Sequence, residues 1–396
     1  MGLTYGLENY RLDTMNEQDN KKLSMWESAS IITGYGIGGG VMAMPYLAER
    51  NGIPMAFLIL TIAFFSSIIL HLMLADMMLK SGRDTQIIGL FSKYVFVGKL
   101  KNVMTISFFV IMLLVLLTNL ATYIAGAAEI ITPLVGLSPL AAKIIFYLVA
   151  AAVALFGLKA LGISEKYAVA VIYILIFTLA GFSFFHISRP LPMKVGSLNQ
   201  GLAYFGMAMF SFSAFFSVPQ AVAGLDGDAG RIRKAIVFGM LNNYILIVVI
   251  TISALLSSTE VTKVAMVGWS RGIGSWATIV GSVFTLLAML TTYWSISLAL
   301  SDIIREQSHW NEKICWVAAT VPSILITFLD LGGFMEFMRL AGGLIAIIIA
   351  LMVVPAYRKS RREEGLETLG RLGSTPMQVF ILIAYVLMAV GNVVTV

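Results

Sequence analysis

The sequence is poor in cysteine and histidine. Cys315 is the only cysteine among 396 residues, and the three histidines (His71, His186 and His309) lie far apart. A lone cysteine excludes an intramolecular disulfide framework and a cysteine-based metal site, and the histidines have no metal-ligand spacing. Neither a His-Glu-x-x-His motif nor a paired nucleophile and base occurs. We therefore predict that the protein is not an enzyme and needs no organic cofactor.

Charge is also scarce, since only 12% of the residues are charged and 59% are hydrophobic. Soluble chains carry about 25% charged and about 45–50% apolar residues. A soluble fold of this length could not bury so much apolar surface. The solvent for most of the chain must be lipid, and spans that satisfy their own backbone are helices. We predict an all-α membrane protein, with a cytoplasmic tail over 1–24 and one transmembrane domain over 25–396.

The apolar runs predict eleven transmembrane helices. A bilayer core about 30 Å thick needs roughly 20 apolar residues per helix. Runs of this length occur near 26–48, 53–79, 102–132, 139–157, 165–187, 200–224, 235–257, 277–303, 312–329, 333–356 and 376–395. The connections between them are short and polar, so no second domain is expected.

The basic residues predict the orientation of these helices. Of the 27 lysines and arginines, 20 fall on the side of the N-terminal tail and 7 on the other side. Cytoplasmic loops carry the excess of such residues. We predict a multi-pass protein of the cell membrane, with the N-terminus in the cytoplasm and the C-terminus outside. The net charge of +6 then reflects topology, so no nucleic-acid partner is needed, and no obligatory protein partner is evident.

The first predicted span is interrupted by glycine. Five of the seven residues in 34–40 are glycine, and Pro45 follows. Each glycine in a helix interior costs about 1 kcal/mol relative to alanine. A broken helix survives in lipid only where it lines a cavity or touches a ligand. The alternative is a close crossing of two helices through spaced small residues, but a contiguous glycine run favours a break.

The sixth predicted span carries a weaker interruption, Ser211 to Ser217 followed by Pro219. Proline removes a backbone donor, and serine hydroxyls can pair with the groups that a break leaves free. Disturbed segments at matching positions of two halves are typical of inverted-repeat transporters, whose substrate site lies between the halves.

Backbone chemistry at such a break suits a zwitterion. The first N–H groups of a restarting helix are unpaired and carry positive partial charge. The amides of Gly38, Gly39 and Gly40 would therefore bind a carboxylate. Free carbonyl oxygens of the preceding segment suit an ammonium group or a small cation. The predicted cargo is a neutral, zwitterionic amino acid.

Three segments resemble amino-acid permeases of the amino acid/auxin permease type, including the bacterial aromatic and hydroxy amino-acid permeases of the amino acid-polyamine-organocation superfamily. They are Gly36-Ile37-Gly38-Gly39-Gly40-Val41-Met42-Ala43-Met44-Pro45-Tyr46, Leu225-Asp226-Gly227-Asp228 and Thr291-Thr292-Tyr293-Trp294-Ser295. The resemblance covers nearly the whole chain and implies the LeuT fold. That fold has two five-helix inverted repeats, here about 25–187 and 200–356, with broken helices 1 and 6 and one extra C-terminal helix at about 376–395.

The resemblance also implies site residues. The substrate is expected to meet Gly36, Gly38, Gly39, Gly40, Tyr123, Phe210, Ser211 and Ser213, with Tyr123 bonding its carboxylate and Asn119 facing the same pocket. A coupling sodium ion is expected between carbonyls of Thr33 and Gly36, placed by alignment on Pro45, and Ala288, Thr291 and Thr292 of the eighth helix. Oxygen ligands suit such a hard cation.

The coupling ion has an alternative. Proton-driven relatives can use a lysine on the fifth helix in place of sodium. Lys166 lies at the entrance of that helix, and no residue from Tyr167 to Phe185 is charged, which favours sodium. Proton-coupled transport remains the second interpretation, and a channel or sensor that does not pump is the third.

The other charged or titratable residues in the predicted spans are expected mainly to have structural or surface positions. His71 is expected to be a hydrogen-bonded structural histidine, with proton coupling as the alternative. Glu129 is expected near the outer surface. Glu336 and Arg339, three residues apart on the tenth span, could pair with each other or form part of an outer gate.

Overall fold

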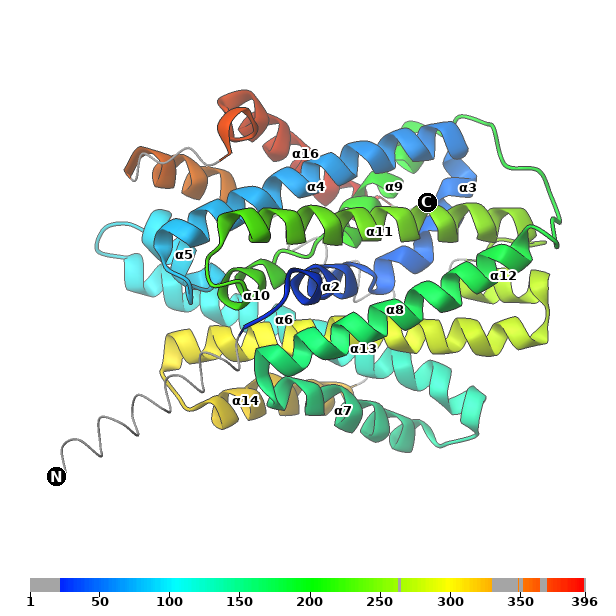
Figure 1. Ribbon diagram of the computed structural model, residues 1–396, viewed down its shortest axis with the longest axis horizontal. Coiled ribbons are helices and arrows are strands. Elements are labelled where there is room, and N and C mark those ends of the chain that lie inside the picture. The colour runs from blue at the N-terminus through cyan, green and yellow to red at the C-terminus, as the bar shows by residue number, and fades with distance from the viewer. Residues whose placement is uncertain (1–21, 263–264, 330–347, 349–351, 364–368, 395–396) are drawn as a thin grey trace.

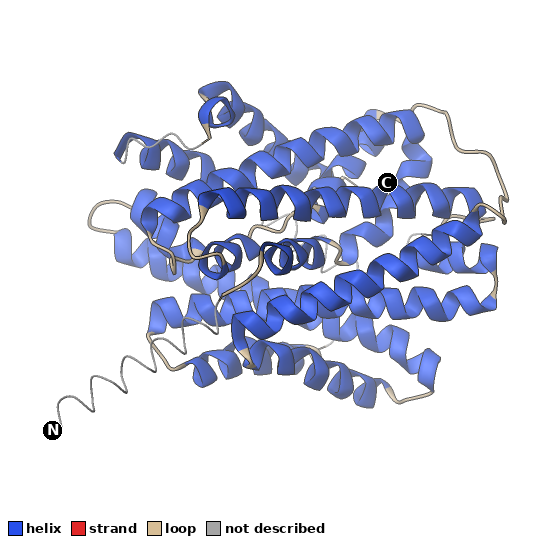
Figure 2. Ribbon diagram, in the orientation of Figure 1, coloured by secondary structure: helices blue, strands red, loops and turns tan. Residues whose placement is uncertain are grey.

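The computed structural model describes residues 22–262, 265–329, 348, 352–363 and 369–394 (Figure 1). Within these ranges the chain forms helices, turns and loops and no strand (Figure 2), so the all-α prediction is confirmed. Most of the predicted tail (1–24) and most of the predicted tenth span (333–356), with Glu336 and Arg339, lie outside the described residues.

The helices follow the apolar runs of the sequence. In chain order they are α2 (Met25–Gly36), η1 (Gly39–Ala43), α3 (Met44–Asn51), α4 (Ile53–Ser81), α5 (Ile87–Tyr94), α6 (Lys101–Val135), α7 (Pro139–Leu155), α8 (Gly157–Ser183), α9 (Leu198–Ser211), α10 (Ser217–Gly224), α11 (Ala229–Ser257), α12 (Ala265–Ile273), α13 (Ser275–Ser308), α14 (Glu312–Ile326), η2 (Gly370–Gly373) and α16 (Thr375–Val393). Residues 352–363 are also helical.

Local sequence fixes where these helices begin and end. Ser24 caps α2 in a capping box with Glu27, and Ser197 caps α9 in the same way with Gln200. Each box satisfies backbone N–H groups that have no acceptor inside the helix. At the end of α6, Gly136 adopts a left-handed conformation (φ 73°), which only glycine adopts without strain. The cap residues therefore set the boundaries more sharply than hydrophobicity does.

Among the described residues, six helices are long and apolar enough to cross a membrane: α4, α6, α8, α11, α13 and α16. A seventh crossing is possible if the segments on either side of the glycine run count as one bent span. The predicted spans near 139–157 and 312–329 are the shorter helices α7 and α14, with 17 and 15 residues. The span near 200–224 is the pair α9 and α10.

The short helix α2 lies at the centre of the bundle, packed against α8, α11 and α13 (Figure 1). The protein itself buries 78% of the most apolar window of α13 but only 33% of that of α6. α13 therefore lies in the interior of the helix bundle, whereas most of the surface of α6 faces away from the protein. At the C-terminal end of the chain, α16 packs against α9 and α4.

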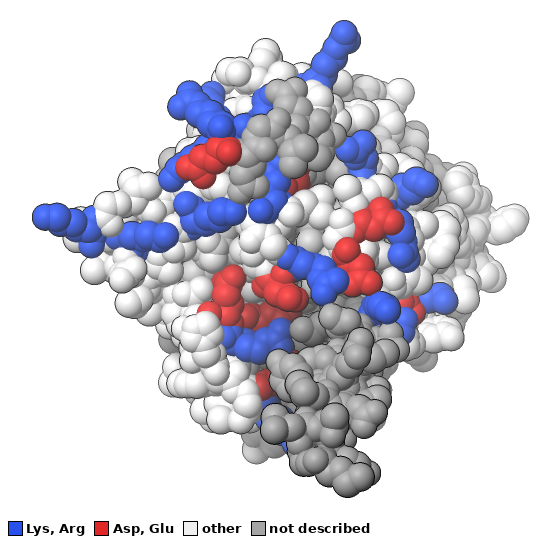
Figure 3. Space-filling view, turned by 60° about the vertical axis from the view of Figure 1, so that its left-hand side comes forward, with Lys and Arg blue, Asp and Glu red and all other residues white. Residues whose placement is uncertain are grey.

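Basic and acidic side chains lie close together on the face that Figure 3 shows, the left-hand side of Figure 1, and several ion pairs join residues near α5 and α10. They join Lys80 to Asp76, Arg83 to Asp226, Lys159 to Glu27, and Arg305 to Asp302 and Glu312. At the opposite end, Arg189 binds Glu49. The end near α5 and α10 is the one on which the sequence places the excess of basic residues.

Candidate functional site

The interruption predicted in the first span is present. α2 ends at Gly36, and the N–H of Ile37 closes its last turn by donating to the Thr33 carbonyl (3.0 Å). The chain restarts as the tight helix η1 at Gly39 and continues into α3, and the segments on either side of the break are bent by 51°. Pro45 stands near the start of α3, where a missing N–H costs nothing.

The interruption in the sixth span is also present, between the end of α9 at Ser211 and the start of α10 at Ser217. Side chains satisfy the broken backbone. The hydroxyl of Ser217 donates to the Ala214 carbonyl, and the N–H of Ala214 donates to Nε2 of His71 (3.1 Å).

His71 is buried in α4 and uses both ring nitrogens. Its Nδ1 lies 2.6 Å from the carbonyl oxygen of Ser67, which can only accept a hydrogen bond. Nδ1 therefore carries the proton, and Nε2 is the acceptor for Ala214. This arrangement agrees with the structural role expected for His71, because the neutral imidazole holds the second break in place.

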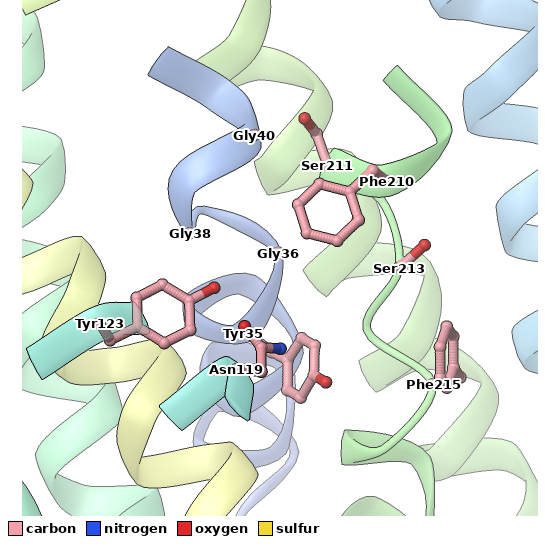
Figure 4. Close-up of a pocket in the computed structure, with 10 residues that line it drawn as sticks. All are labelled: Tyr35, Gly36, Gly38, Gly40, Asn119, Tyr123, Phe210, Ser211, Ser213 and Phe215. Atoms are coloured by element: carbon pink, nitrogen blue, oxygen red, sulfur yellow. The ribbon is translucent and has the colours of Figure 1, made fainter. Parts of the chain in front are cut away.

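The two breaks face each other across a small cavity (Figure 4). Its lining residues are uncharged and are Tyr35, Gly36, Gly38, Gly40, Asn119, Tyr123, Phe210, Ser211, Ser213 and Phe215. Its volume is about 20 Å³, enough for about one water molecule. In this structure the cavity is therefore too small for a molecule of amino-acid size.

The residues predicted to bind substrate are brought together at this cavity. All of them line it except Gly39, which lies between two lining glycines in η1. The hydroxyl of Tyr123 points towards the glycine segment, and Ser211 lies opposite Gly40 (Figure 4). The hydroxyls of Ser211 and Ser213 donate to carbonyls of their own helix, so they present their oxygens as acceptors.

The glycines at the first break are closely surrounded. A β-carbon on Gly38 would lie 2.8 Å from Oγ1 of Thr292 and 2.9 Å from the hydroxyl oxygen of Tyr123. On Gly40 it would lie 2.5 Å from Oγ of Ser211. Real β-carbons do not approach other heavy atoms this closely. Glycine is required at these positions because neighbouring side chains fill the space.

The residues predicted to bind sodium lie at the contact between α2 and α13. The hydroxyls of Thr291 and Thr292 approach the carbonyl oxygen of Gly34 at 3.1 and 3.2 Å, and each lies 3.0 Å from the Ala288 carbonyl. Thr292 also lies 3.5 Å from the Tyr35 carbonyl. These are oxygen donors of the kind that sodium takes. The threonines thus meet the carbonyls of Gly34 and Tyr35, the residues between the predicted Thr33 and Gly36.

Two buried polar residues near this contact are missing from the sequence prediction. Asn243 of α11 packs against Gly36, where a β-carbon would lie 1.9 Å from its Nδ2. Glu165 of α8 packs against Gly34, where a β-carbon would lie 1.9 Å from its Oε2. Both side chains are fully buried. The sequence offered one signal for each, because a polar side chain within a predicted apolar span indicates a possible functional residue.

Other charged groups have ordinary settings. Glu129 is exposed on α6. Asp76 is buried but pairs with Lys80 at 2.9 Å, and Asp302 pairs with Arg305 at 3.1 Å. The described residues contain no group of three or more histidine, cysteine or acidic side chains that could hold a metal ion.

The chain ahead of α2 is attached to the end of α10, the helix that follows the second break. The N–H of Leu23 donates to the carbonyl of Gly224 at the end of α10 (2.7 Å). The Leu23 side chain packs against Gly162 and Gly224, so closely that a β-carbon on either would lie within 2.5 Å of it. Four residues later, Glu27 binds Lys159 of α8.

A larger cavity of about 500 Å³ opens near this attachment. Residues of α10, α13 and α14 line it, including Gln220, Ser301 and Trp316. Gln220 is buried and donates from Nε2 to the Ser295 carbonyl (2.9 Å). The end of the molecule that carries most of the ion pairs is therefore already partly hollow.

Comparison with known sequences supports a transport protein. Residues 21–392 match the tryptophan/tyrosine permease family. Glutamine transporter 2 of Aliivibrio fischeri (strain ATCC 700601 / ES114) is 23% identical over 363 residues, which cover 86% of this chain and 91% of that protein.

Two solved structures share the fold. Mhp1, a nucleobase-cation-symport-1 family transporter in a closed conformation with bromovinylhydantoin bound, has a TM-score of 0.65 at 13% identity, over 93% of this chain and 91% of that chain. MhsT in complex with L-phenylalanine has a TM-score of 0.61 at 16% identity, over 94% of this chain and 99% of that chain. At these identities the similarity shows the LeuT-type fold alone.

Proposed function

Since this chain belongs to the tryptophan/tyrosine permease family, we propose that it imports a neutral amino acid by alternating access, coupled to the entry of sodium. It is a multi-pass membrane transporter and not an enzyme. The observation that carries the proposal is the pair of helix breaks that face each other across a small cavity with an uncharged lining.

The cavity offers both halves of a zwitterion a partner. The first N–H groups of η1 have no acceptor within the helix, and they suit the substrate carboxylate together with the hydroxyl of Tyr123. Carbonyls at the ends of α2 and α9 suit the ammonium group. The described lining contains no fixed charge to favour a cationic or dianionic side chain. One matched protein is named as a glutamine transporter and one of the two structural neighbours holds L-phenylalanine; these two amino acids share this zwitterionic head.

The proposal assigns the coupling ion to the contact of α2 with α13. The proposed site consists of Ala288, Thr291 and Thr292 together with carbonyls near the end of α2, within the stretch from Thr33 to Gly36. One sodium ion moving down a potential of about 100 mV releases about 2.3 kcal/mol, and a tenfold gradient adds about 1.4 kcal/mol. Together they would sustain several-hundred-fold accumulation.

The proposed topology completes this account. Eleven crossings in two inverted five-helix repeats, with α16 as the extra helix, would put the cavity between the repeats. The cytoplasmic side would be the end with most of the ion pairs, so the N-terminus would be inside and the C-terminus outside a cell membrane. No organic cofactor and no obligatory protein partner are required.

Uptake into proteoliposomes tests the proposal. Purified protein should accumulate labelled glutamine, phenylalanine, tyrosine or tryptophan above equilibrium under an inward sodium gradient. A sodium ionophore should abolish the accumulation, and liposomes without protein provide the control. Equal uptake with and without sodium would remove the sodium claim, and accumulation under a proton gradient alone would establish the alternative coupling. Equilibration without accumulation would indicate a channel.

A further inference from the structure

Glu165 is the buried acid that the proposed mechanism leaves without a role. It lies on α8, its side chain is fully buried, and Oε1 accepts a hydrogen bond from Oγ of Ser295 on α13 (2.9 Å). Its other oxygen, Oε2, has no hydrogen-bond partner among the described residues. A buried carboxylate in a membrane helix is costly unless a positive charge compensates it.

No basic side chain supplies that charge among the described residues. Lys166, the next residue along α8, is exposed. Basic groups on the helices packed against α8 are engaged or exposed. Lys143 of α7 donates to the Thr327 carbonyl, Lys159 binds Glu27, Arg305 of α13 binds Asp302 and Glu312, and Arg231, Arg233 and Lys234 of α11 and Arg271 of α12 are exposed. α10 carries no titratable side chain.

The unpartnered oxygen of Glu165 lies beside the proposed sodium site. A β-carbon on Gly34 would lie 1.9 Å from Oε2 of Glu165 and 3.0 Å from Cβ of Thr291. The carbonyl of the same glycine meets the hydroxyls of Thr291 and Thr292. One residue of α2 thus brings a carboxylate from α8 together with the hydroxyl and carbonyl oxygens of α13.

We propose that Glu165 supplies the negative charge of the coupling cation's site. This inference rests on the proposed function and adds to it an anionic ligand, which the otherwise neutral oxygen set lacks. A monovalent cation beside Oε2 would compensate the buried carboxylate and would join α2, α8 and α13. The cation would therefore stabilise the closed contact of α2 with its two neighbours.

A series of side-chain contacts also leads from Glu165 to the larger cavity. Ser295, which donates to Glu165, is itself contacted through its carbonyl by Gln220. Gln220 lines the cavity of about 500 Å³ near α10 and α14. Ser295 and Gln220 therefore connect the carboxylate with the larger cavity, at the end proposed to face the cytoplasm.

Binding of ²²Na⁺ to the purified, detergent-solubilised full chain tests this assignment. Glu165→Gln keeps the shape of the side chain and its acceptor for Ser295 but removes the charge. We expect sodium affinity to fall at least 100-fold in Glu165→Gln and by a smaller factor in Glu165→Asp. The matched control is Glu129→Gln, an exposed acid on α6, which should bind sodium like the wild type.

A purely structural role for Glu165 predicts a different result. The near-isosteric glutamine would then leave sodium affinity unchanged, and that outcome would overturn the assignment. If Glu165→Gln does not yield folded protein, infrared difference spectra of the wild type with sodium against choline decide the matter. A sodium-dependent carboxylate band, also present in Glu129→Gln, supports the assignment, and its absence overturns it.

Failure of sodium coupling itself would look different. A wild type that binds no sodium but accumulates substrate under a proton gradient would remove sodium from the proposed function. Glu165 would then be judged by the proton-driven reaction. Loss of accumulation in Glu165→Gln with intact substrate exchange would support its place in the cation site, whereas retained proton-driven accumulation would overturn it.

Discussion

The two helix breaks face the same cavity but are held open by different means. At the first, neighbours press directly on glycine: Thr292 and Tyr123 on Gly38, and Asn243 on Gly36. At the second, side chains pair with the interrupted backbone, since His71 accepts from the Ala214 N–H and Ser217 donates to the Ala214 carbonyl.

This difference indicates that the two breaks have different roles. The first break keeps its backbone close to the cavity because no side chain stands in the way, as the proposed binding of substrate and ion requires. The second break has its polar groups satisfied from within the protein, and it contributes side chains such as Phe210 and Ser211. Space is therefore the critical property of the first break, and hydrogen bonding is the critical property of the second.

Adding one carbon to the first break should have the largest effect. We expect Gly38→Ala to reduce amino-acid uptake at least 100-fold, because its methyl group would lie 2.8 Å from Oγ1 and 3.4 Å from Cγ2 of Thr292, so that either rotamer of Thr292 stays in its way. The control is Gly181→Ala on α8, where a β-carbon meets nothing within 4 Å. Uptake by Gly38→Ala within threefold of the wild type, measured in proteoliposomes, would contradict the importance of space at this break.

Removing the side chain that holds the second break should reduce stability first. His71→Ala removes one of the two acceptors of the buried Ala214 N–H, which keeps only the Phe212 carbonyl (2.9 Å), and the lost hydrogen bond costs about 0.5–1.5 kcal/mol. We expect a lower thermal unfolding midpoint in detergent and a smaller loss of uptake than in Gly38→Ala. His186→Ala, at an exposed position, should leave the midpoint unchanged. An unchanged midpoint in His71→Ala would mean that the second break holds itself open.

The smallest effect is expected at the ion contact of the first break. Thr292→Val keeps the volume of the side chain but removes the hydroxyl that lies 3.2 Å from the Gly34 carbonyl. We expect the sodium concentration for half-maximal uptake to rise about tenfold, which corresponds to about 1.4 kcal/mol. Thr285→Val on the same helix removes a hydroxyl bonded within α13 and serves as the control. Equal sodium dependence in both variants would separate Thr292 from the ion.

Both breaks could be predicted from the sequence because they rest on local chemistry. A contiguous glycine run cannot sustain a helix interior, and the prolines that follow favour a new helix start. The positions of Tyr123 and Phe210 came from family resemblance, and the structure places both at the cavity. Features that depend only on the residue types within one segment, such as these helix breaks, can therefore be predicted from the sequence alone.

Glu165 escaped prediction because of helix geometry. Adjacent residues on a helix point about 100° apart, given 3.6 residues per turn. Lys166 can therefore be exposed while Glu165 is buried, although the sequence shows two charges side by side at the start of an apolar run. Which of them faces inward depends on the packing of α8 against α2 and α13, which no local pattern specifies.

The carbonyls that meet the threonines of α13 differ by a single residue from those chosen by alignment on Pro45, for a related reason. Alignment on Pro45 counts residues, but the five residues of η1 form a tight turn whose rotation and rise differ from those of an α-helix. The rotation of α2 about its own axis decides which carbonyls meet α13. In this structure Gly34 and Tyr35 meet the threonines.

The contact between Leu23 and Gly224 holds the segment ahead of α2 against the end of α10. Burial of one leucine is worth about 1.5–3 kcal/mol, and one backbone hydrogen bond adds about 0.5–1.5 kcal/mol. The proposed alternating access would require α2 and α10 to move relative to each other, and an attachment of this size can break and re-form without unfolding either helix.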